Sequence, residues 1–509
     1  MTINHDKYPI PTQLFIGGKL CDSVSPERYS IYNPVDDSLV TDQIQYAVAE
    51  DVDRAVASAQ AALQSESWGG LSAPERGRKL MRAAAILAEN KDEIAWLDRI
   101  TMGKPVQAGL GEIQMAVELL EYYAGWADKH AGETYPADHG YLKIVQHEPF
   151  GVCAGILPWN GPIGMIAFKL SPALATGNVM ILKPSEKSPL SALRVAALLS
   201  DVLPPGVLQV LPGAGATGDI LARHPQIRKI SFTGSGITGK KIQKASAESN
   251  LKRVTLELGG KTPAGVFDDC NFENALEWAT NSITMNSGQV CVAASRLYVQ
   301  ESIAERFLAA FVEKMKAAAA AMGDPNDAKT MYGPLADKAQ LSRVQGMFTQ
   351  DGGKTQILTG GQRRGDEGCF FEPTVLYNPD PDAQLYKNEI FGPVACVRTF
   401  KDEEDFLRMA NDSEYGLMAA VFTKDLGRAM RVSARLESGS VGVNCTTAIN
   451  WQTPFGGSKQ SGIGRELGKW GLQSYTEPKT ILIKGFLRGA GKREVVALAI
   501  PFPHTPYQL

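Results

Sequence analysis

The sequence predicts an α/β protein with a parallel sheet, and two observations carry this prediction. In the middle of the chain, short apolar runs alternate with stretches of helical periodicity, and every run ends in a glycine, a proline or a polar cluster. Such alternation is typical of parallel strands joined by helices, which bind ligands at the carboxyl ends of the strands. The expected strands are 151–157, 179–182, 207–211, 229–232 and 253–258.

Helices are expected where apolar residues recur with the helical period. Between the strands they are 190–203 and 217–223. Before the strands, 51–64, 74–100 and 108–129 form a helical N-terminal region.

The second half of the chain repeats the alternation, which indicates a second α/β domain. Its expected helices are 272–287 and 302–322. Its expected strands are 296–300, 394–400, 418–422 and 440–445.

Composition excludes several classes of function. The chain has 509 residues, 44% of them hydrophobic and 21% charged, which suits two to four globular domains. A net charge of −3 gives no electrostatic case for nucleic acid or an anionic membrane as partner. Seven scattered cysteines without C-x-x-C, and six histidines without H-x-x-x-H, argue against disulfides and against a metal site. With no signal peptide and no apolar run of 18 residues, we expect a cytoplasmic protein.

The stretch KISFTGSGITGKKI (229–242) has three interpretations. Gly234, Gly236 and Gly239 match the dinucleotide fingerprint G-x-G-x-x-G, in the right place between a strand and a helix. A P-loop fails, because Lys241 stands where Ser or Thr must ligate magnesium. A tight turn without a ligand stays open on this motif alone.

Four other positions suggest chemistry, each with an ordinary alternative. Cys291, after a glycine turn, can be a nucleophile or a buried spacer. Glu257, in an apolar strand end, can be a base of raised pKa, or the partner of Arg253 or Lys261. Asn160 can donate to an oxyanion or cap a turn.

The fourth position is the strand end with Lys183 and Glu186, which can bind a ribose or form a solvated pair. Two loops dense in Gly and Pro, 388–394 and 454–468, hold Glu389 and Glu466 and are either functional or plain connectors.

Taken together, these motifs occur in one order over about 300 residues, and the sequence resembles the NAD(P)-dependent aldehyde dehydrogenase superfamily from about residue 14 to residue 484. The resemblance implies that Cys291 attacks the aldehyde to form a thiohemiacetal, which hydride transfer converts to a thioester. Asn160 and the backbone N–H of Cys291 would form the oxyanion hole, and Glu257 would activate the hydrolytic water. Lys169 and Glu466 would carry the proton out.

The resemblance also implies a cofactor site for NAD, with NADP possible, although Glu186 would repel a 2′-phosphate. Phe232–Ser235 would meet the pyrophosphate, and Glu389 with Phe391 would hold the nicotinamide and its ribose. The implied cofactor residues are Ile156, Pro158, Trp159, Lys183, Ser185, Glu186, Gly215, Phe232, Thr233, Gly234, Ser235, Thr238, Leu258, Gly259, Glu389 and Phe391.

The implied substrate pocket is apolar and favours an aliphatic or aromatic aldehyde. Its residues would be Gly161, Gly164, Met165, Phe168, Val290, Val292, Ile449, Trp451 and Phe455. Alternatives are a betaine-type aldehyde, a semialdehyde, a CoA-acylating relative, and a non-catalytic structural homologue.

The implied fold has three parts: a Rossmann-variant NAD-binding domain (1–130 and 150–259), an α/β catalytic domain (260–473), and a small β oligomerisation arm (131–149 and 474–487). In the arm, 141–146 reads as a strand. A homodimer or homotetramer follows from the arm. Residues 488–509 form a C-terminal extension beyond the usual family end.

Overall fold

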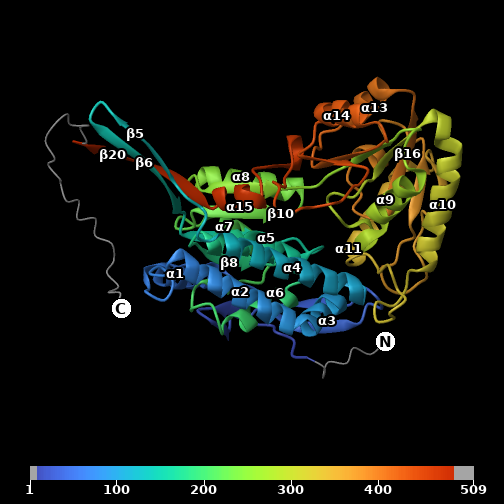
Figure 1. Cartoon of the computed structure of the whole chain (residues 1–509). Helices are drawn as coiled ribbons and strands as arrows, with labels where there is room; N and C mark the ends of the chain where they lie inside the picture. The colour runs from blue at the N-terminus through green and yellow to red at the C-terminus, as the bar shows by residue number, and fades with distance from the viewer. Residues whose placement is uncertain (1–7, 486–509) are drawn as a thin grey trace. The chain divides into compact units, whose positions relative to one another are not determined.

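The predicted parallel sheet is present in the computed structural model, which describes residues 8–485 (Figure 1). Its strand order is β19-β11-β10-β7-β8-β9-β1-β2, and the five strands from β11 to β9 are parallel. All five sequence-predicted strands are confirmed within two residues. Their bounds are β7 Val152–Ile156, β8 Val179–Lys183, β9 Leu208–Val210, β10 Lys229–Thr233 and β11 Arg253–Glu257.

Short antiparallel strands complete this sheet, and sequence patterns did not reveal them. They are β1 Leu14–Ile16, β2 Lys19–Cys21 and β19 Gly462–Ile463. A separate hairpin joins β3 Arg28–Tyr32 to β4 Leu39–Gln45. The N-terminal region is therefore helical only from residue 49 onward.

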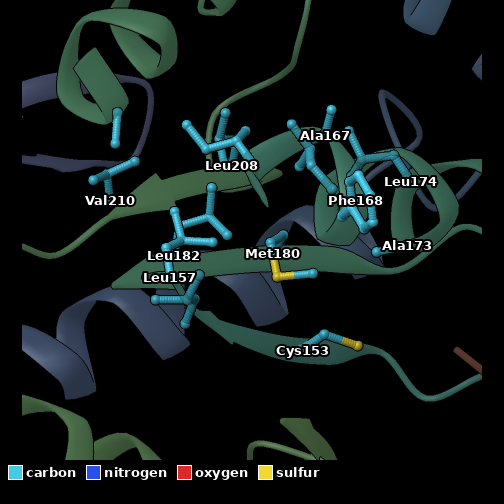
Figure 2. Packing of buried hydrophobic residues seen from close by; sticks show 14 of the residues in the cluster. Cys153, Leu157, Ala167, Phe168, Ala173, Leu174, Met180, Leu182, Leu208 and Val210 are labelled. Carbon is cyan, nitrogen blue, oxygen red and sulfur yellow. The ribbon is translucent and has the colours of Figure 1, made fainter. Parts of the chain in front are cut away.

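The core of this part is built from the strands and from the helices that follow them. Figure 2 shows Met180, Leu182 and Leu208 of the sheet packed near Phe168 of α5, and all four are buried. Burial on both faces explains why these strands appear in the sequence as continuous apolar runs. The helices are α5 Pro162–Ala175, α6 Leu190–Leu199, α7 Gly215–Arg223 and α8 Gly236–Glu248.

The N-terminal helices differ from the prediction at one place. The stretch 74–100, expected as one helix, is two, because the backbone turns at Asn90 and the Asn90 side-chain amide donates to the Ile86 carbonyl at 2.8 Å. A side chain that competes for the helix's own acceptors ends the first helix there. The helices are α1 Ala49–Gln64, α2 Ala73–Glu89, α3 Lys91–Met102 and α4 Val106–Trp126.

The second half forms a seven-stranded sheet of order β14-β15-β16-β13-β12-β17-β18, parallel except for β14. The strands are β12 Pro263–Val266, β13 Arg296–Gln300, β14 Gln356–Thr359, β15 Thr374–Tyr377, β16 Val394–Phe400, β17 Met418–Phe422 and β18 Ser440–Val443. The helices are α9 Phe272–Thr284, α10 Ala304–Ala320, α11 Lys338–Asp351, α12 Gln384–Lys387, α13 Glu403–Asn411, α14 Leu426–Arg435 and α15 Gly468–Gln473.

Two boundaries in this half correct the sequence prediction. The helix expected over 272–287 ends at Thr284, and a turn with left-handed residues follows. The helix expected over 302–322 begins at Ala304, after a short 3₁₀ turn, and ends at Ala320.

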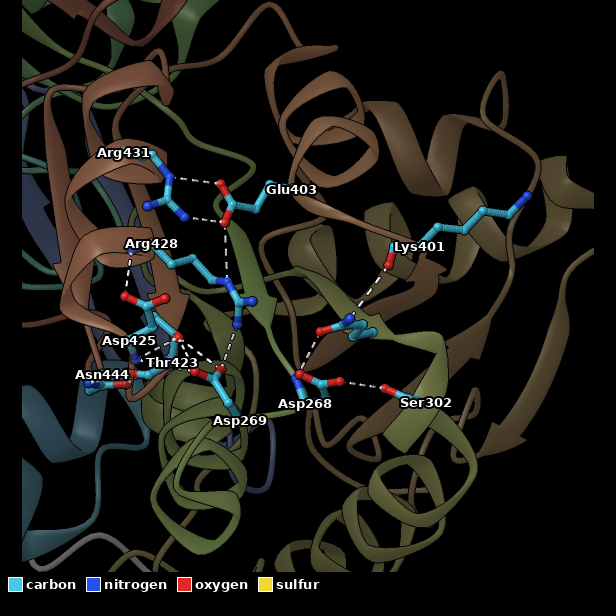
Figure 3. A network of polar contacts seen from close by, with 11 residues as sticks. Asp268, Asp269, Ser302, Lys401, Glu403, Thr423, Asp425, Arg428, Arg431 and Asn444 are labelled. Carbon is cyan, nitrogen blue, oxygen red and sulfur yellow. Dashed lines mark hydrogen bonds and ion pairs between the residues drawn. The ribbon is translucent and has the colours of Figure 1, made fainter.

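An ion network on the surface ties α13 and α14 to the sheet (Figure 3). Arg428 donates to Asp269 at 2.8 Å and pairs with Glu403 at 3.2 Å, while Arg431 also reaches Glu403 at 2.7 Å. Thr423 donates to the same Asp269 carboxylate at 2.8 Å. We call Asp269, Glu403, Thr423, Arg428 and Arg431 the surface network.

The chain divides into two compact units. The first comprises the residues up to His130 with Pro149–Thr476, and the second comprises Ala131–Glu148 with the residues from Glu477 on. The second is built on a three-stranded antiparallel sheet of β5 Glu133–Asp138, β6 Tyr141–Pro149 and β20 Thr476–Lys484. β6 contains the strand predicted over 141–146. The predicted extension 488–509 lies outside the described residues.

Within residues 8–485, no helix combines the length and apolar character needed to cross a membrane. The same residues contain no group of three or more His, Cys, Asp or Glu side chains arranged to hold a metal ion.

Candidate active site

A cavity of about 820 Å³ lies at the carboxyl ends of β7, β8, β10 and β11. All the residues predicted to bind the cofactor line it, as do Asn160, Glu257 and Cys291. Sequence reasoning missed other lining residues, and no motif marks them because they are placed by helices α7, α8 and α11. They include Gly218, Asp219, Ala222, Ile237, Lys241, Ile242, Gln340 and Arg343.

Cys291 lies in a strained loop after α9. Asn286, Ser287 and Gly288 all have positive φ, at 48°, 54° and 70°. Only glycine fits at position 288, because an added Cβ would collide with the Gly392 carbonyl. The Ser287 hydroxyl donates to the Gly333 carbonyl at 2.6 Å and fixes the turn. The loop therefore presents the partly exposed Cys291 to the cavity.

Glu257 ends β11 and is buried, with only 4% of its surface exposed. Burial raises its pKa to about 8, against the opposing effect of a hydrogen bond with the Cys291 thiol. The alternative pairing with Lys261 is absent, since that amine donates to the Leu385 carbonyl at 2.8 Å. Oε1 of Glu257 has no hydrogen-bond partner among residues 8–485. The carboxyl group is therefore available to accept a proton next to the thiol.

The surroundings of Cys291 favour the protonated thiol over the thiolate. Burial raises its pKa well above the ordinary value, and the nearby Glu257 carboxylate raises it further. The thiol must lose its proton to become a nucleophile, and its hydrogen-bonded neighbour Glu257 is a group that can take it.

Asn160 follows β7 and faces the nucleophile loop. Its side-chain amide donates to the Gln289 carbonyl at 3.0 Å, and its own carbonyl accepts from the Asn286 side chain at 3.1 Å. These two bonds fix Asn160 to the loop that carries Cys291. The second N–H of the amide can donate to an oxygen beside the thiol.

The strand ends of β8 and β10 supply groups suited to a nucleotide. The Lys183 amine, buried with its pKa lowered to about 8, donates to the Pro184 carbonyl at 2.7 Å and lies 4.0 Å from the half-exposed Glu186 carboxylate. Ser235 caps α8, accepting from the Thr238 N–H at 3.4 Å. The amino end of a helix favours anions such as phosphate.

Helix α11 holds the loop that contains Glu389 and Phe391. Arg343 donates to the carbonyls of Glu389 and Ile390, both at 2.7 Å, and Gln340 donates to the Phe391 carbonyl at 2.7 Å. The Glu389 carboxylate accepts from the Gly260 N–H at 3.0 Å, and burial raises its pKa to about 7. Gln340 and Arg343 thus position two predicted cofactor residues.

Lys169 and Glu466 form a buried ion pair at 2.9 Å. The Lys169 amine also donates to Ser231 at 3.0 Å and to Thr233 at 2.9 Å. Ser231 donates in turn to Glu466 Oε1 at 2.9 Å, whereas Oε2 has no partner among the described residues. The structure brings together the pair that the sequence assigned to proton transfer.

None of the nine predicted substrate residues lines the cavity. Three of them contact one another: the Phe168 ring lies 6.5 Å from the Trp451 ring and 6.2 Å from the Phe455 ring between centroids. Helix α4, which was predicted from the sequence over 108–129 but not as part of the pocket, contributes to this group. Glu112 accepts the Gly164 N–H at 2.9 Å, and Glu118 accepts the Trp451 indole N–H at 3.2 Å. The signal available in the sequence was the two glutamates, Glu112 and Glu118, on the helix predicted over 108–129.

Comparisons with known proteins agree with this geometry. The model of the aldehyde dehydrogenase family matches residues 21–481. Human retinal dehydrogenase 2 is 42% identical over 480 residues, 93% of this chain and 92% of that protein. The chain therefore belongs to the aldehyde dehydrogenase family, and it is an NAD(P)-dependent aldehyde dehydrogenase.

Solved structures extend the likeness to three dimensions. Indole-3-acetaldehyde dehydrogenase from P. syringae, in complex with NAD⁺, is 38% identical, with a TM-score of 0.91 over 94% of this chain and 98% of that one. Betaine aldehyde dehydrogenase from Staphylococcus aureus, also in complex with NAD⁺, is 36% identical, with a TM-score of 0.90 over 95% and 97%. The aldehyde dehydrogenase fold predicted from the sequence is confirmed.

Proposed function

We propose that the protein oxidises an apolar aldehyde to the carboxylic acid with NAD as oxidant. The observation that carries this proposal is the contact between Cys291 and Glu257 at the wall of the cavity, with Asn160 fixed to the same loop. A nucleophile, a base and an oxyanion donor are the groups that such a reaction needs.

In the first half of the reaction, Glu257 removes the thiol proton and Cys291 attacks the aldehyde carbon. The Asn160 amide and the backbone N–H of Cys291 stabilise the negative oxygen of the thiohemiacetal. NAD, when bound, accepts the hydride that converts this adduct to a thioester.

Before the second half, Glu257 releases the thiol proton through the buried Lys169–Glu466 pair. Glu257 then takes a proton from water, which attacks the thioester and releases the acid. The buried Lys169–Glu466 pair then carries the proton away from the base. The unpartnered oxygens of Glu257 and Glu466 support this role, since each can hydrogen bond to a water between them.

The cavity suits NAD in size and in chemistry. Its volume of about 820 Å³ is ample for a dinucleotide site, and the amino end of α8 offers N–H groups to phosphates. Glu186 would accept from ribose hydroxyls and repel a 2′-phosphate, which supports NAD over NADP. Glu389 and Phe391 would hold the nicotinamide and its ribose.

The substrate class follows from the second group of residues. Phe168, Trp451 and Phe455 are aromatic, and the relatives named for retinal and for indole-3-acetaldehyde act on apolar compounds by their names. The two carboxylates on α4 favour a betaine-type aldehyde as the second candidate and count against a semialdehyde that bears its own carboxylate.

We further propose the three-part division of the chain predicted from the sequence, with the β5–β6–β20 sheet as an arm for a homodimer or homotetramer, and a cytoplasmic location. An exposed antiparallel edge is a ready site for another chain to pair.

The test is NADH absorbance with NAD and four aldehydes: hexanal, phenylacetaldehyde, betaine aldehyde and succinic semialdehyde. We expect turnover highest with the first two, lost in Cys291→Ala, and unchanged in Cys21→Ala, a partly exposed cysteine on β2. Turnover that requires CoA would support the acylating alternative, and NAD binding without turnover of any aldehyde would refute the catalytic proposal.

A further inference from the structure

Two neighbouring strands of the nucleotide-side sheet carry polar residues along one face. Residues two apart on a strand share a face. In the parallel register of β10 and β11, every second residue of β10 from Lys229 is paired with every second residue of β11 from Arg253. We call this band the polar stripe. It consists of Lys229, Ser231 and Thr233 on β10, paired in order with Arg253, Thr255 and Glu257 on β11.

The polar stripe is unusual for its place in the fold. Strands of a parallel sheet with both faces covered are normally apolar, and burying an amine or a carboxyl group is costly. All members except Arg253 are nevertheless buried, and the Lys229 side chain is only 1% exposed.

The stripe is continuous with the proton-transfer pair. Lys169 of α5 donates to both Ser231 and Thr233, and Ser231 donates to Glu466. Gly155 on β7 makes this possible: an added Cβ there would lie 3.2 Å from Lys169 Cδ and 2.8 Å from a Leu182 methyl.

The stripe has two ends. At the carboxyl ends of the strands, Thr233 and Glu257 line the cavity. At the amino ends, the Lys229 amine donates to Thr255 at 2.9 Å, and its register partner Arg253 is exposed. Four residues of extended strand span about 13 Å, so the stripe runs along the strands from Glu257 at their carboxyl ends to their amino ends.

We propose that the polar stripe conducts the proton of thioester hydrolysis from Glu257 to solvent at the amino ends of β10 and β11, with Ser231 and Lys229 as relay residues beyond Glu466. This inference rests on the proposed function. In each step one O–H or N–H bond breaks and another forms. On this path the proton passes from the Glu257 carboxyl group through water to Glu466 and on to the Ser231 hydroxyl. It crosses to Thr255, the register partner of Ser231, and reaches the neutral Lys229 amine, which contacts Thr255; the ammonium then releases it to water.

The surroundings of Lys229 suit it to this exchange. Burial lowers its pKa to about 7, so that the amine and the ammonium are both populated near neutral pH. The charged or titratable groups that face it are Cys153 of β7, Lys169 of α5, Arg253 of β11, Glu466, and the Tyr475 ring at 5.5 Å. Cys153 stays a neutral thiol, because burial raises its pKa to about 12.

The experiment separates hydrolysis from the steps before it. Enzyme is mixed with NAD and hexanal, the first burst of NADH is followed by absorbance, and the decay of the acyl adduct on Cys291 is followed by intact mass. The variants are Lys229→Met, Ser231→Ala and Ser231→Thr, which keeps the hydroxyl. The matched control is Lys252→Met, which also removes a buried amine. Lys252 precedes Arg253 in the sequence but lies off the stripe, because its amine donates to Ser249 at 3.0 Å.

In Lys229→Met and Ser231→Ala we expect the acyl adduct to decay at least fivefold more slowly than in wild type, with the rate of the NADH burst unchanged. In Ser231→Thr and Lys252→Met we expect decay at the wild-type rate. Decay at the wild-type rate in both Lys229→Met and Ser231→Ala would overturn the proposal, as would an equal slowing of burst and decay, which indicates a structural role. A wild-type enzyme with neither burst nor adduct would refute the proposed function itself. If Lys229→Met does not fold, the Ser231 pair decides alone.

Discussion

Two clusters of charged side chains in this molecule use the same chemistry in opposite surroundings. The Lys169–Glu466 pair is buried within the nucleotide-side sheet, with one carboxylate oxygen unpartnered. The surface network around Arg428 is partly exposed and more fully paired (Figure 3). A buried pair contributes little net stability after desolvation, and an exposed pair contributes little because water screens it. Since neither cluster contributes much net stability, the difference supports the proposed role of the buried pair in proton transfer, whereas the surface network orders the side chains around α13 and α14.

The largest expected effect is on the rate of NADH formation when Glu257, the proposed base, is replaced. Glu257→Gln replaces the base with an amide that cannot accept a proton, so steady-state NADH formation should fall by about 10²–10⁴-fold. Glu403→Gln, which changes a surface-network carboxylate in the same way, should leave the rate unchanged. A rate within threefold of wild type for Glu257→Gln would remove this residue from the mechanism.

The next effect concerns stability. Lys169→Met leaves the Glu466 carboxylate buried without its cation, and the free energy of unfolding should fall by about 3–5 kcal/mol. Urea denaturation measures this loss. The double variant Lys169→Met with Glu466→Gln should recover much of it, since no buried charge then remains. A single variant as stable as wild type would show that the pair is not desolvated as the structure indicates.

The third effect is a pH dependence. With a pKa of about 8, roughly a tenth of Glu257 is ionised at pH 7, so the hydrolysis rate should rise about tenfold between pH 7 and pH 9. The measurement is adduct decay across that range. A flat profile, or one that falls, would contradict Glu257 as the base.

The contribution of a carboxyl group to stability should depend on pH with opposite signs at the buried Glu257 and at Glu403 of the surface network. Between pH 4.5 and about 8, folded Glu257 holds a proton that the unfolded chain has released, so its contribution to stability falls as pH rises. Hydrogen bonds from Arg431 lower the pKa of Glu403, whose contribution is therefore present above the unfolded pKa and is lost in acid. Urea melts of Glu257→Gln at pH 5 and pH 8, and of Glu403→Gln at pH 3 and pH 6, each against wild type, would measure the two contributions.

The smallest effect lies at the rim of the surface network. Arg435 pairs with Glu404, and both side chains are more than half exposed. Arg435→Ala should lower the free energy of unfolding only slightly, and less at high salt, because water screens the pair. A loss as large as that of Lys169→Met would erase the contrast between the clusters.

Much of the fold could be predicted because its signals are local. Strands buried on both faces appear as apolar runs, and Gly or Pro marks where each ends. Glu257 was noticed because it is a charge in an apolar strand end, and Cys291 because it is a thiol after a glycine turn. Their roles were implied by the resemblance of the ordered motifs to a known family. The break at Asn90 was missed because helical periodicity continues across it, while a single side-chain hydrogen bond ends the helix.

The rest depends on contacts between distant parts of the chain. Gln340 and Arg343 act on a loop about 50 residues away, and the α4 carboxylates meet partners as far away as Trp451. Lys229 and Ser231 lie in a run that reads as an ordinary buried strand. Only the register of β10 against β11 shows that they are paired with Arg253 and Thr255.

Gly155 has a consequence for how this sequence can change. Its bare backbone leaves the space through which the Lys169 stem passes over β7, so a methyl group at 155 would crowd that lysine and Leu182 together. A side chain at 155 would require the Leu182 methyl to move away and the Lys169 stem to shift by a smaller amount. A shorter residue at 169 would make the same room, but it would forfeit the cation beside Glu466.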